Sequence, residues 1–320
     1  MDVLVTGGLG YLGARVTDHF RRAGHRVSVL GRSGHPEYGE WLEGLRVIRA
    51  DVSDPASVAG CCEGIELVVH CAALNAQQAA ADPRAAVLVN GYGARNVLEE
   101  AAQAGVRRFL YMSTIHVYGP LAGGPLDEDT PPRPLTDYAI SKLLGEAYCY
   151  RASAATPMSV AVLRPSNGYG APLFPSADCW MLVINDFCRR AVEHGEILLT
   201  SAGTQQRDFV ALSDIVRAIE LLASPALPKE PLREIVYDVG AGNSVSVREL
   251  ADVVASVFAE EFGRTVPVHV APDAVPTPAG KPMEYGTSRI SSLGYRPTAD
   301  MREEIRHILQ FVAGTEAGHA

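Results

Sequence analysis

Short runs of apolar residues alternate with segments of helical periodicity along the first half of the chain. The runs lie at residues 3–5, 27–30, 47–50, 67–70, 108–112 and 160–163. Apolar runs of this length predict strands that are buried on both faces of a parallel sheet. Helical patterns lie between them at about 11–23, 83–104 and 138–155. The alternation predicts an α/β fold in which helices cover both faces of a doubly wound parallel sheet.

The regular alternation fades after residue 165. Later patterns predict helices at 181–194, at 214–223 and from 246 onward, and strands at 196–199 and 235–239. We therefore expect two domains. Residues 1–165 form the domain with the parallel sheet, and residues 166–320 form a smaller mixed α/β domain, from which later strands can still return to the first sheet.

Composition and charge narrow the class of protein. Apolar residues make up 47% of the 320 residues and charged residues 20%, as in ordinary globular proteins. The net charge of −9 argues against a nucleic-acid-binding surface. No run of about 18 apolar residues is present, and Met1 runs almost directly into the first strand rather than into a signal peptide. We therefore expect a cytoplasmic protein that does not interact with membranes.

The cysteines predict neither a metal site nor a disulfide framework. Their spacing fits no metal-ligand motif, and we expect reduced thiols and no bound metal. The six cysteines are Cys61, Cys62, Cys71, Cys149, Cys179 and Cys188.

A glycine-rich turn joins the first predicted strand to the first predicted helix. Gly7, Gly8, Gly10 and Gly13 match the spacing G-x-G-x-x-G in this strand–turn–helix context. Glycines let the backbone approach a pyrophosphate, which then lies at the helix N-terminus. The motif therefore predicts a Rossmann domain that binds NAD or NADP.

The end of the second strand bears on the choice between these cofactors. An acidic side chain there would bond the ribose hydroxyls of NAD, but the sequence reads Gly31-Arg32-Ser33. Arg32 can pair with the 2′-phosphate of NADP. We therefore favour NADP(H), and NAD(H) remains open. Asp51, at the end of the third strand, is expected near the adenine.

A tyrosine and a lysine four residues apart suggest the chemistry. Tyr138 and Lys142 lie on one face of a predicted helix. An ammonium beside a phenol lowers the phenol pKa, so the tyrosine can exchange a proton near neutral pH. The pattern alone also occurs on solvated helix faces. Together with the glycine turn and the strand end Ser113-Thr114, it predicts a hydride-transfer enzyme with a tyrosine acid/base.

The order of these and later segments resembles a known family. The segments are TGGLGYLG (6–13), ADV (50–52), HCAA (70–73), VNGYGARNVLEEA (89–101), STIHVYG (113–119), YAISK (138–142), LRPSNGYG (163–170), RDFVALSDI (207–215), YDVGAG (237–242) and LGYRP (293–297). They resemble the extended short-chain dehydrogenase/reductase family, in its group of NAD(P)-dependent nucleotide-sugar epimerases and dehydratases. The resemblance covers almost the whole chain.

The resemblance implies roles for individual residues. Tyr138 would be the acid/base at the reacting sugar carbon, Lys142 would hold the nicotinamide ribose, and Thr114 would hydrogen-bond the reacting oxygen. Asn167 and Arg207 would contact the substrate, Arg207 at its diphosphate. Asn90 is either a cofactor contact or a structural residue. The cofactor-binding residues implied in all are Gly7, Gly10, Tyr11, Leu12, Gly13, Arg32, Asp51, Val52, Cys71, Ala72, Ala73, Asn90, Tyr138, Lys142 and Pro165.

One segment departs from the family pattern. Dehydratases of this family carry Thr-Asp-Glu where this chain has Thr114-Ile115-His116. Both carboxylates for water elimination are missing, so a 4,6-dehydratase is disfavoured. His116 either acts as a second acid/base, because an unperturbed imidazole has a pKa of about 6.5, or shapes the pocket. Trp180 either stacks on a base or packs in the core.

Several functions remain open. The first is a 4-epimerase or a 4-ketoreductase of a nucleotide-activated sugar. The alternative is an NADPH-dependent reductase of a non-nucleotide carbonyl compound, and Arg207 discriminates between the two. A cofactor-sensing protein without activity is disfavoured by the retained Tyr138, Lys142 and Thr114. The resemblance also implies a homodimer formed through the helices at about 84–104 and 138–155.

Overall fold

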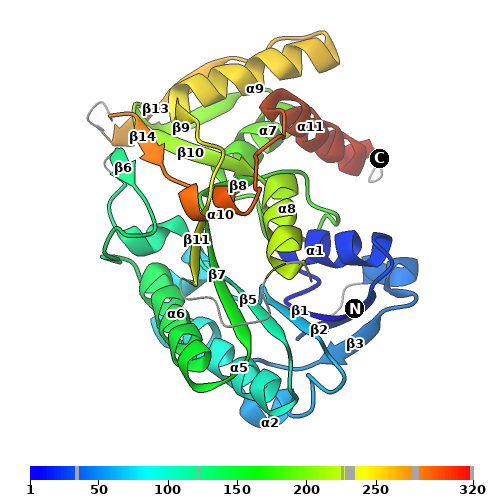
Figure 1. The fold of residues 1–320 in the computed structure, drawn as a ribbon. Helices are drawn as coiled ribbons and strands as arrows, with labels where there is room; N and C mark the ends of the chain where they lie inside the picture. Colours follow the sequence, from blue (N-terminus) through cyan, green and yellow to red (C-terminus); the bar gives the residue numbers. More distant parts are fainter. Residues whose placement is uncertain (33–35, 122, 225–226, 228–234, 276–280, 318–320) are drawn as a thin grey trace.

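A parallel sheet of seven strands forms the centre of the computed structural model (Figure 1). The structure describes all residues except 33–35, 122, 225–226, 228–234, 276–280 and 318–320. The strands lie in the order β11-β7-β5-β4-β1-β2-β3, and every neighbouring pair is parallel. Their bounds are β1 (Asp2–Thr6), β2 (Arg26–Gly31), β3 (Arg46–Arg49), β4 (Leu67–His70), β5 (Arg108–Met112), β7 (Ser159–Pro165) and β11 (Val236–Val239). The predicted doubly wound α/β fold is confirmed.

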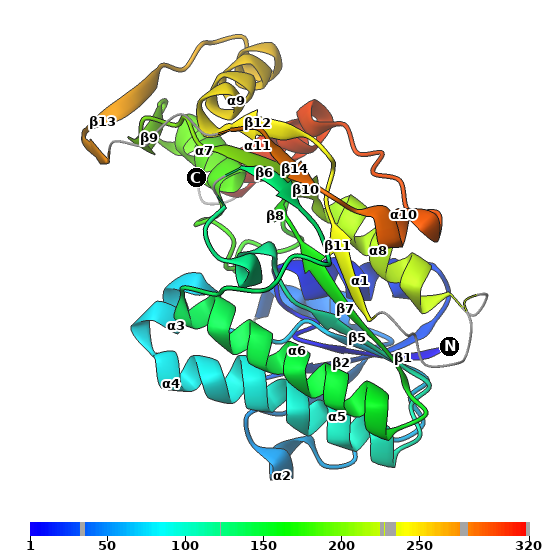
Figure 2. The same cartoon turned by 60° about the vertical axis from the view of Figure 1, so that its left-hand side comes forward.

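Helices cover both faces of this sheet, as the buried apolar strands require. On one face lie α1 (Tyr11–Arg22) and α8 (Leu212–Ala223), whose apolar side chains share one core with β1, β2 and β4. On the other face lie α2 (Pro55–Val58), α5 (Gly93–Gln103) and α6 (Asp137–Ala155), which close a second core (Figure 2).

The helix that we expected at about 83–104 consists of three pieces. After α3 (Ala76–Ala81) come α4 (Pro83–Ala86), the π-helical segment η2 (Val87–Tyr92) and then α5. A π-helical segment adds a residue to a helical turn and changes the direction of the side chains beyond it. Here it turns Asn90 into the protein interior.

A smaller layer of short sheets and helices packs above the carboxyl ends of the main strands. Its strands are β8 (Asn167–Tyr169), β10 (Gln206–Ala211) and β12 (Ser244–Ser246) in one sheet, β9 (Ile197–Ser201) with β13 (Val268–Val275), and β6 (Gly124–Leu126) with β14 (Met283–Tyr285). The helices α7 (Val183–Glu193), α9 (Val247–Phe262) and α11 (Met301–Ala317) share a third apolar core, and α10 (Ser288–Ser292) lies beside β11. The segment η1 (Pro36–Leu42), which is kinked at Gly39, follows β2, and the short 3-10 turn η3 (Ile115–Tyr118) follows β5.

The chain passes between the two layers on both sides of residue 166. Strand β11 pairs with β7, and α8 covers the main sheet, although both come from the C-terminal half. Conversely, β6 precedes residue 166 and pairs with β14 of the upper layer. The division into domains 1–165 and 166–320 therefore does not follow the layers, and it stays a prediction.

Candidate active site

The glycine turn lies where the strand order reverses, between β1 and β4. Gly7 has φ +65°, a left-handed conformation that favours glycine. A Cβ on Gly7 would lie 2.8 Å from the backbone of Ala72, and one on Gly13 would lie 2.0 Å from the carbonyl oxygen of Gly7. The turn is thus packed directly against the end of β4 and leaves no room for side chains. Ligands of doubly wound sheets bind at this position.

A cavity of about 500 Å³ opens over the glycine turn. It is lined by most of the residues that we predicted to bind the cofactor, which are Gly7, Gly10, Tyr11, Leu12, Gly13, Arg32, Asp51, Val52, Cys71, Ala72, Ala73 and Tyr138. The backbone of the glycine turn, the Arg32 guanidinium and the cavity volume of about 500 Å³ fit a dinucleotide. Asn90, Lys142 and Pro165 do not line it.

Asn90 lies behind the cavity wall. Its side-chain oxygen accepts a hydrogen bond from the Leu74 backbone N–H (2.7 Å), and its amide group donates to the Leu74 carbonyl (3.2 Å) and to the Ser141 hydroxyl (2.9 Å). The side chain is fully buried. These bonds favour the structural alternative, in which Asn90 fixes the segment after β4 to helix α6.

Arg32 and Asp51 line the cavity just after the ends of β2 and β3. Although burial acts to raise the pKa of Asp51, hydrogen bonds from Ser53 and the charge of Arg32 hold that pKa below its usual value. The Arg32 side chain is exposed. Ser33, which we named with Arg32, lies outside the described residues.

Tyr138 lines the same cavity, and Thr114 is its hydrogen-bond partner. The Thr114 hydroxyl oxygen accepts the His116 backbone N–H (3.2 Å), which leaves the hydroxyl hydrogen for the Tyr138 oxygen. Burial raises the pKa of Tyr138, and the hydrogen bond from Thr114 opposes this effect. The lowering that we expected from Lys142 is not among these effects, and burial leaves the pKa of Tyr138 above its usual value.

Lys142 is buried one turn further along α6 than Tyr138. Its Nζ lies 4.4 Å from the centre of the Tyr111 ring, a cation–π contact. Burial lowers the pKa of Lys142 to about 8, and Glu146, one turn further along α6, acts in the opposite direction. The ammonium is therefore only weakly stabilised by its surroundings.

His116 and Arg207 lie near Tyr138. The His116 and Tyr138 rings are 6.4 Å apart, edge to face. His116 is accessible to solvent, yet the surrounding protein atoms lower its pKa and the charge of Arg207 lowers it further. Arg207 donates to the carbonyl oxygens of Leu121 (3.0 Å) and Gln206 (2.9 Å).

The remaining predicted substrate residue, Asn167, lies on β8 beside β10, the strand that carries Arg207. Its side chain donates to the Asp208 carbonyl at 2.8 Å. A second cavity of about 660 Å³ lies nearby between α7 and β9, and Trp180, Arg189 and Phe187 line it. The guanidinium of Arg189 is 5.9 Å from the Trp180 ring centre.

Several cavity residues were not predicted from the sequence, among them Asn75 and Gln78 after β4, Tyr38, and residues 176–178. Tyr38 lies in η1, which has no clear helical or strand periodicity. Residues 176–178 belong to the loop between β8 and α7. They reach the cofactor cavity only through the arrangement of the two layers, which no local pattern shows.

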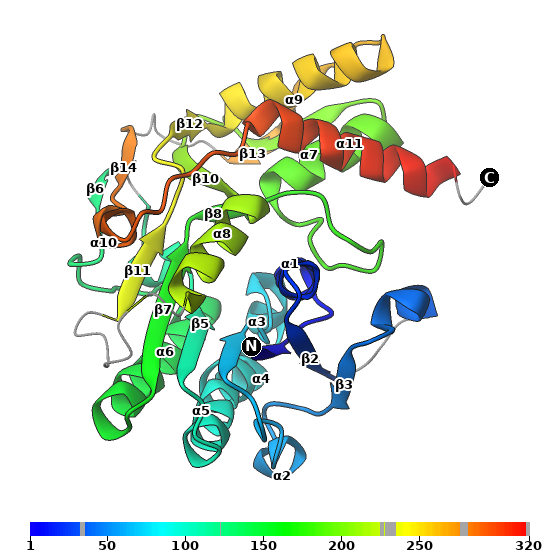
Figure 3. The ribbon, with the colours of Figure 1, turned by 45° about the vertical axis from the view of Figure 1, so that its right-hand side comes forward.

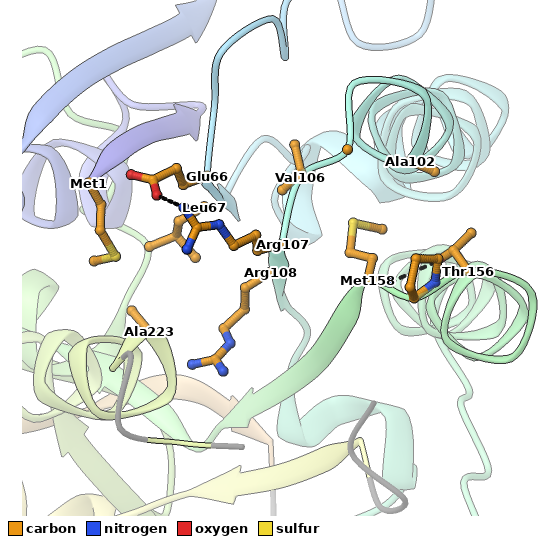
Figure 4. Close-up of a pocket in the computed structure, with 12 residues that line it drawn as sticks. Met1, Glu66, Leu67, Ala102, Val106, Arg107, Arg108, Thr156, Met158 and Ala223 are labelled. Atoms are coloured by element: carbon orange, nitrogen blue, oxygen red, sulfur yellow. Dashed lines mark hydrogen bonds and ion pairs between the residues drawn. The ribbon is translucent and has the colours of Figure 1, made fainter. Parts of the chain in front are cut away.

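A third cavity of about 350 Å³ lies at the opposite edge of the main sheet (Figure 4). Its walls include Leu67, Arg108 and Met158, at or next to the amino ends of β4, β5 and β7, and the ion pair between Arg107 and Glu66 crosses it. Because doubly wound sheets bind their ligands at the carboxyl ends of the strands, we place the active site at the cavity over the glycine turn.

The described part of the chain offers neither a membrane-spanning helix nor a metal-binding cluster. It contains no helix with the length and hydropathy needed to cross a bilayer. It also contains no group of three or more His, Cys, Asp or Glu side chains arranged to hold a metal ion.

Comparison with known proteins agrees with the fold. The NAD dependent epimerase/dehydratase family matches residues 3–240, and the chain belongs to this family. The match confirms the resemblance found in the sequence.

Individual relatives cover the chain almost completely. The putative UDP-glucose 4-epimerase of Methanocaldococcus jannaschii is 26% identical over 97% of this chain and 98% of its own. The dTDP-glucose 4,6-dehydratase of Streptomyces griseus is 26% identical over 94% of this chain and 90% of its own. The solved structure of MoeE5 in complex with UDP-glucose and NAD is 28% identical, with a TM-score of 0.79 over 99% of this chain and 100% of that one.

Proposed function

We propose that this protein is a nicotinamide-dependent 4-epimerase of a nucleotide-activated sugar, with Tyr138 as its acid/base. One observation carries the proposal. The Thr114 hydroxyl is a hydrogen-bond partner of Tyr138, which lines the cavity over the glycine turn, and the buried Lys142 lies one turn further along α6. A sugar carbon placed there would meet a proton acceptor and a hydrogen-bond donor together.

The chemistry follows from these side chains. When bound, the nicotinamide ring accepts and returns a hydride at the sugar carbon, and its oxidised form adds a positive charge near the phenol. Tyr138 takes the proton of the sugar hydroxyl and returns it after the keto sugar has presented its other face. Thr114 donates a hydrogen bond to the same oxygen, and the ammonium of Lys142 favours the phenolate.

Elimination of water is disfavoured in this proposal. Ile115 follows Thr114 and is fully buried in an apolar cluster with Val117 and Met283, so this position offers no acid. The lowered pKa of His116 leaves its imidazole neutral at pH 7, able to accept or donate a proton or to shape the pocket. Since relatives include a dTDP-glucose 4,6-dehydratase, product analysis must include the dehydrated sugar.

The second cavity supports a nucleotide on the substrate. Its lining includes Gln205, two residues before Arg207, and it offers the Trp180 ring as an apolar surface and Arg189 as a cation. A base could stack there while Arg207 holds the diphosphate. The relatives named for UDP-glucose support a UDP-sugar.

For the cofactor, we propose a preference for NADP(H) that depends on Arg32. Residues 31–36 contain no acid, and the exposed Arg32 lines the cavity just after the end of β2. MoeE5 binds NAD, so the preference would distinguish this chain from that neighbour.

We also propose a homodimer in the cytoplasm. Exposed apolar side chains gather on the helices that we expected to pair, with Leu88 and Tyr92 on η2 and Ile140 and Tyr150 on α6, each 39–51% exposed. All six cysteines are free, as a reducing compartment requires. Sedimentation of the wild type and of Ile140→Glu tests the dimer, and a monomeric wild type contradicts it.

Product analysis tests the function. UDP-, dTDP- and GDP-hexoses are incubated with NAD or NADP, and the sugars are separated while absorbance at the reduced-nicotinamide band is followed. Formation of the 4-epimer without net change in absorbance supports the proposal. Tyr138→Phe should lower turnover at least about 100-fold and leave cofactor affinity within a few-fold. Net loss of absorbance with a 4-keto sugar would show a ketoreductase instead.

One observation favours a second candidate, a reductase of non-nucleotide carbonyl compounds. The Arg207 guanidinium already donates to two backbone carbonyls, so part of its bonding capacity serves the protein. If Arg207→Ala leaves the affinity for UDP-sugars unchanged, Arg207 does not bind the diphosphate, and the reductase of non-nucleotide carbonyl compounds is favoured.

A further inference from the structure

The loop between β8 and α7 crosses the cofactor cavity. Residues 170–182 form this loop, and Figure 3 shows it reaching down beside α1. Its start is fixed to α1 by two hydrogen bonds. The Tyr11 hydroxyl donates to the Gly170 carbonyl (2.7 Å), and Arg15 Nε donates to the Ala171 carbonyl (3.0 Å). Further along, residues 176–178 line the same cavity as the glycine turn. We call residues 174–178 the strap.

One end of the strap is attached to η1, the segment after β2. The Phe174 ring meets Tyr38 edge to face with ring centres 4.5 Å apart, and it meets Trp41 in the same way at 5.1 Å. The Ser176 hydroxyl donates to the Glu37 carboxylate. An aromatic cluster and a charge-assisted hydrogen bond thus join the upper layer to the β2 side of the cavity.

The other end is attached to α3, which follows β4. The Asp178 carboxylate accepts hydrogen bonds from the side-chain amides of Asn75 (2.6 Å) and Gln78 (3.3 Å). Both amides are held in place because Asn75 and Gln78 also form the capping box of α3. Asn75, Gln78 and Asp178 all line the cavity. The strap therefore joins the two sides of the cavity above the place for a dinucleotide.

We propose that the strap closes over the bound cofactor and sets the rate at which the cofactor leaves. Release requires the Phe174 cluster or the Asp178 bonds to open, because the glycine turn and the main sheet close the cavity from below. This inference rests on the proposed function and deepens it. An epimerase returns its hydride to the same sugar, so its cofactor is regenerated in place and can remain bound from one turnover to the next.

Displacement kinetics test the strap without reference to catalysis. The full chain is loaded with NADH or NADPH and mixed rapidly with an excess of the oxidised cofactor, and the loss of nicotinamide fluorescence gives the release rate constant. Asp178→Ala and Phe174→Ala should each raise this constant several-fold. The double variant should raise it at least about tenfold, because both attachments are lost.

Two further variants serve as checks. Asn75→Ala removes the shorter of the two Asp178 bonds from the opposite side of the cavity. It should raise the release rate constant in the same direction as Asp178→Ala, by a smaller factor, without any change within the strap. Asp252→Ala, an exposed acid on α9 that faces Arg248, should leave release unchanged.

The outcomes separate the strap from the function. If cofactor-loaded Asn75→Ala and the double variant release at the wild-type rate, the strap is not a gate, whereas the epimerase proposal stands. If the wild type binds neither NADH nor NADPH, both proposals are wrong.

Discussion

A buried ion pair behind the active site should dominate the stability of this region. The Glu146 carboxylate receives two hydrogen bonds from Arg164, at 2.9 Å from Nε and 2.5 Å from Nη2, and one from the Ser113 hydroxyl. The side chains of Arg164 and Glu146 are only 3% and 1% exposed. The carboxylate thus joins α6, the end of β5 next to Thr114, and β7.

Glu146→Leu should lower the free energy of unfolding by about 3–5 kcal/mol, because it leaves the guanidinium buried without a partner. In the double variant Glu146→Leu/Arg164→Met no charge remains. The free energy of unfolding of this double variant should lie only about 1–3 kcal/mol below that of the wild type, because the Ser113 hydroxyl loses its partner and the packing is imperfect. Tyr118, whose ring lies 4.7 Å from the Arg164 guanidinium, would also lose that contact.

Equilibrium unfolding in urea measures both values, with the slope of the transition as a check on the unfolded state. Glu99→Gln is the control, because Glu99 pairs with Arg95 and Arg151 at the surface and its side chain is 37% exposed. This control should change stability by less than about 1 kcal/mol. The reasoning is refuted if Glu146→Leu behaves like the control, or if the double variant is less stable than the single one.

Further predictions concern the glycine turn, the cofactor and pH. Gly13→Ala should abolish cofactor binding, measured by nicotinamide fluorescence, since its Cβ would lie 2.0 Å from the Gly7 carbonyl oxygen; retained affinity would contradict the described turn. Arg32→Ala should weaken NADP(H) binding about tenfold or more and leave NAD(H) binding nearly unchanged; equal losses for both would remove the phosphate role. The pKa of Lys142 is lowered from 10.5 to about 8 in the folded protein. Below pH 8 the folded protein therefore contains an unfavourable buried charge. The free energy of unfolding should rise as the pH increases from 8 toward 10.5. Lys142→Met should therefore stabilise the cofactor-free protein by up to about 3 kcal/mol at pH 7, and this advantage should shrink by pH 10 in thermal unfolding; a pH-independent difference would contradict the pKa.

Local patterns predicted the main sheet and the glycine turn because their causes are local. A run such as residues 67–70 must be buried on both faces, and a turn that contains Gly7 and Gly13 can adopt the close approach seen here. The pairing of Tyr138 with Thr114 could also be predicted from the sequence, since Tyr138 lies on a helix face and Thr114 follows the end of a strand.

Features that depend on distant parts of the chain were not predicted. The contact of Tyr38 with Phe174 joins residues far apart in sequence, and neither carries a recognisable motif. The raised pKa of Tyr138 follows from burial by several elements, whereas the sequence showed only Lys142. The π-helical segment that orients Asn90 interrupts a pattern that reads as one continuous helix.

The return of β11 to the main sheet limits how this protein can be recombined. A chimera that exchanges residues 166–320 with a relative would also exchange the strand beside β7 and the helix α8 over the first core. A C-terminal exchange meant to transfer substrate specificity would therefore also replace two elements that pack on the main sheet beneath the cofactor cavity. Exchange of the shorter segment 167–211, which carries β8, α7, β9 and β10, keeps β11 and α8 native and replaces only the strap among the parts of the cofactor cavity described above.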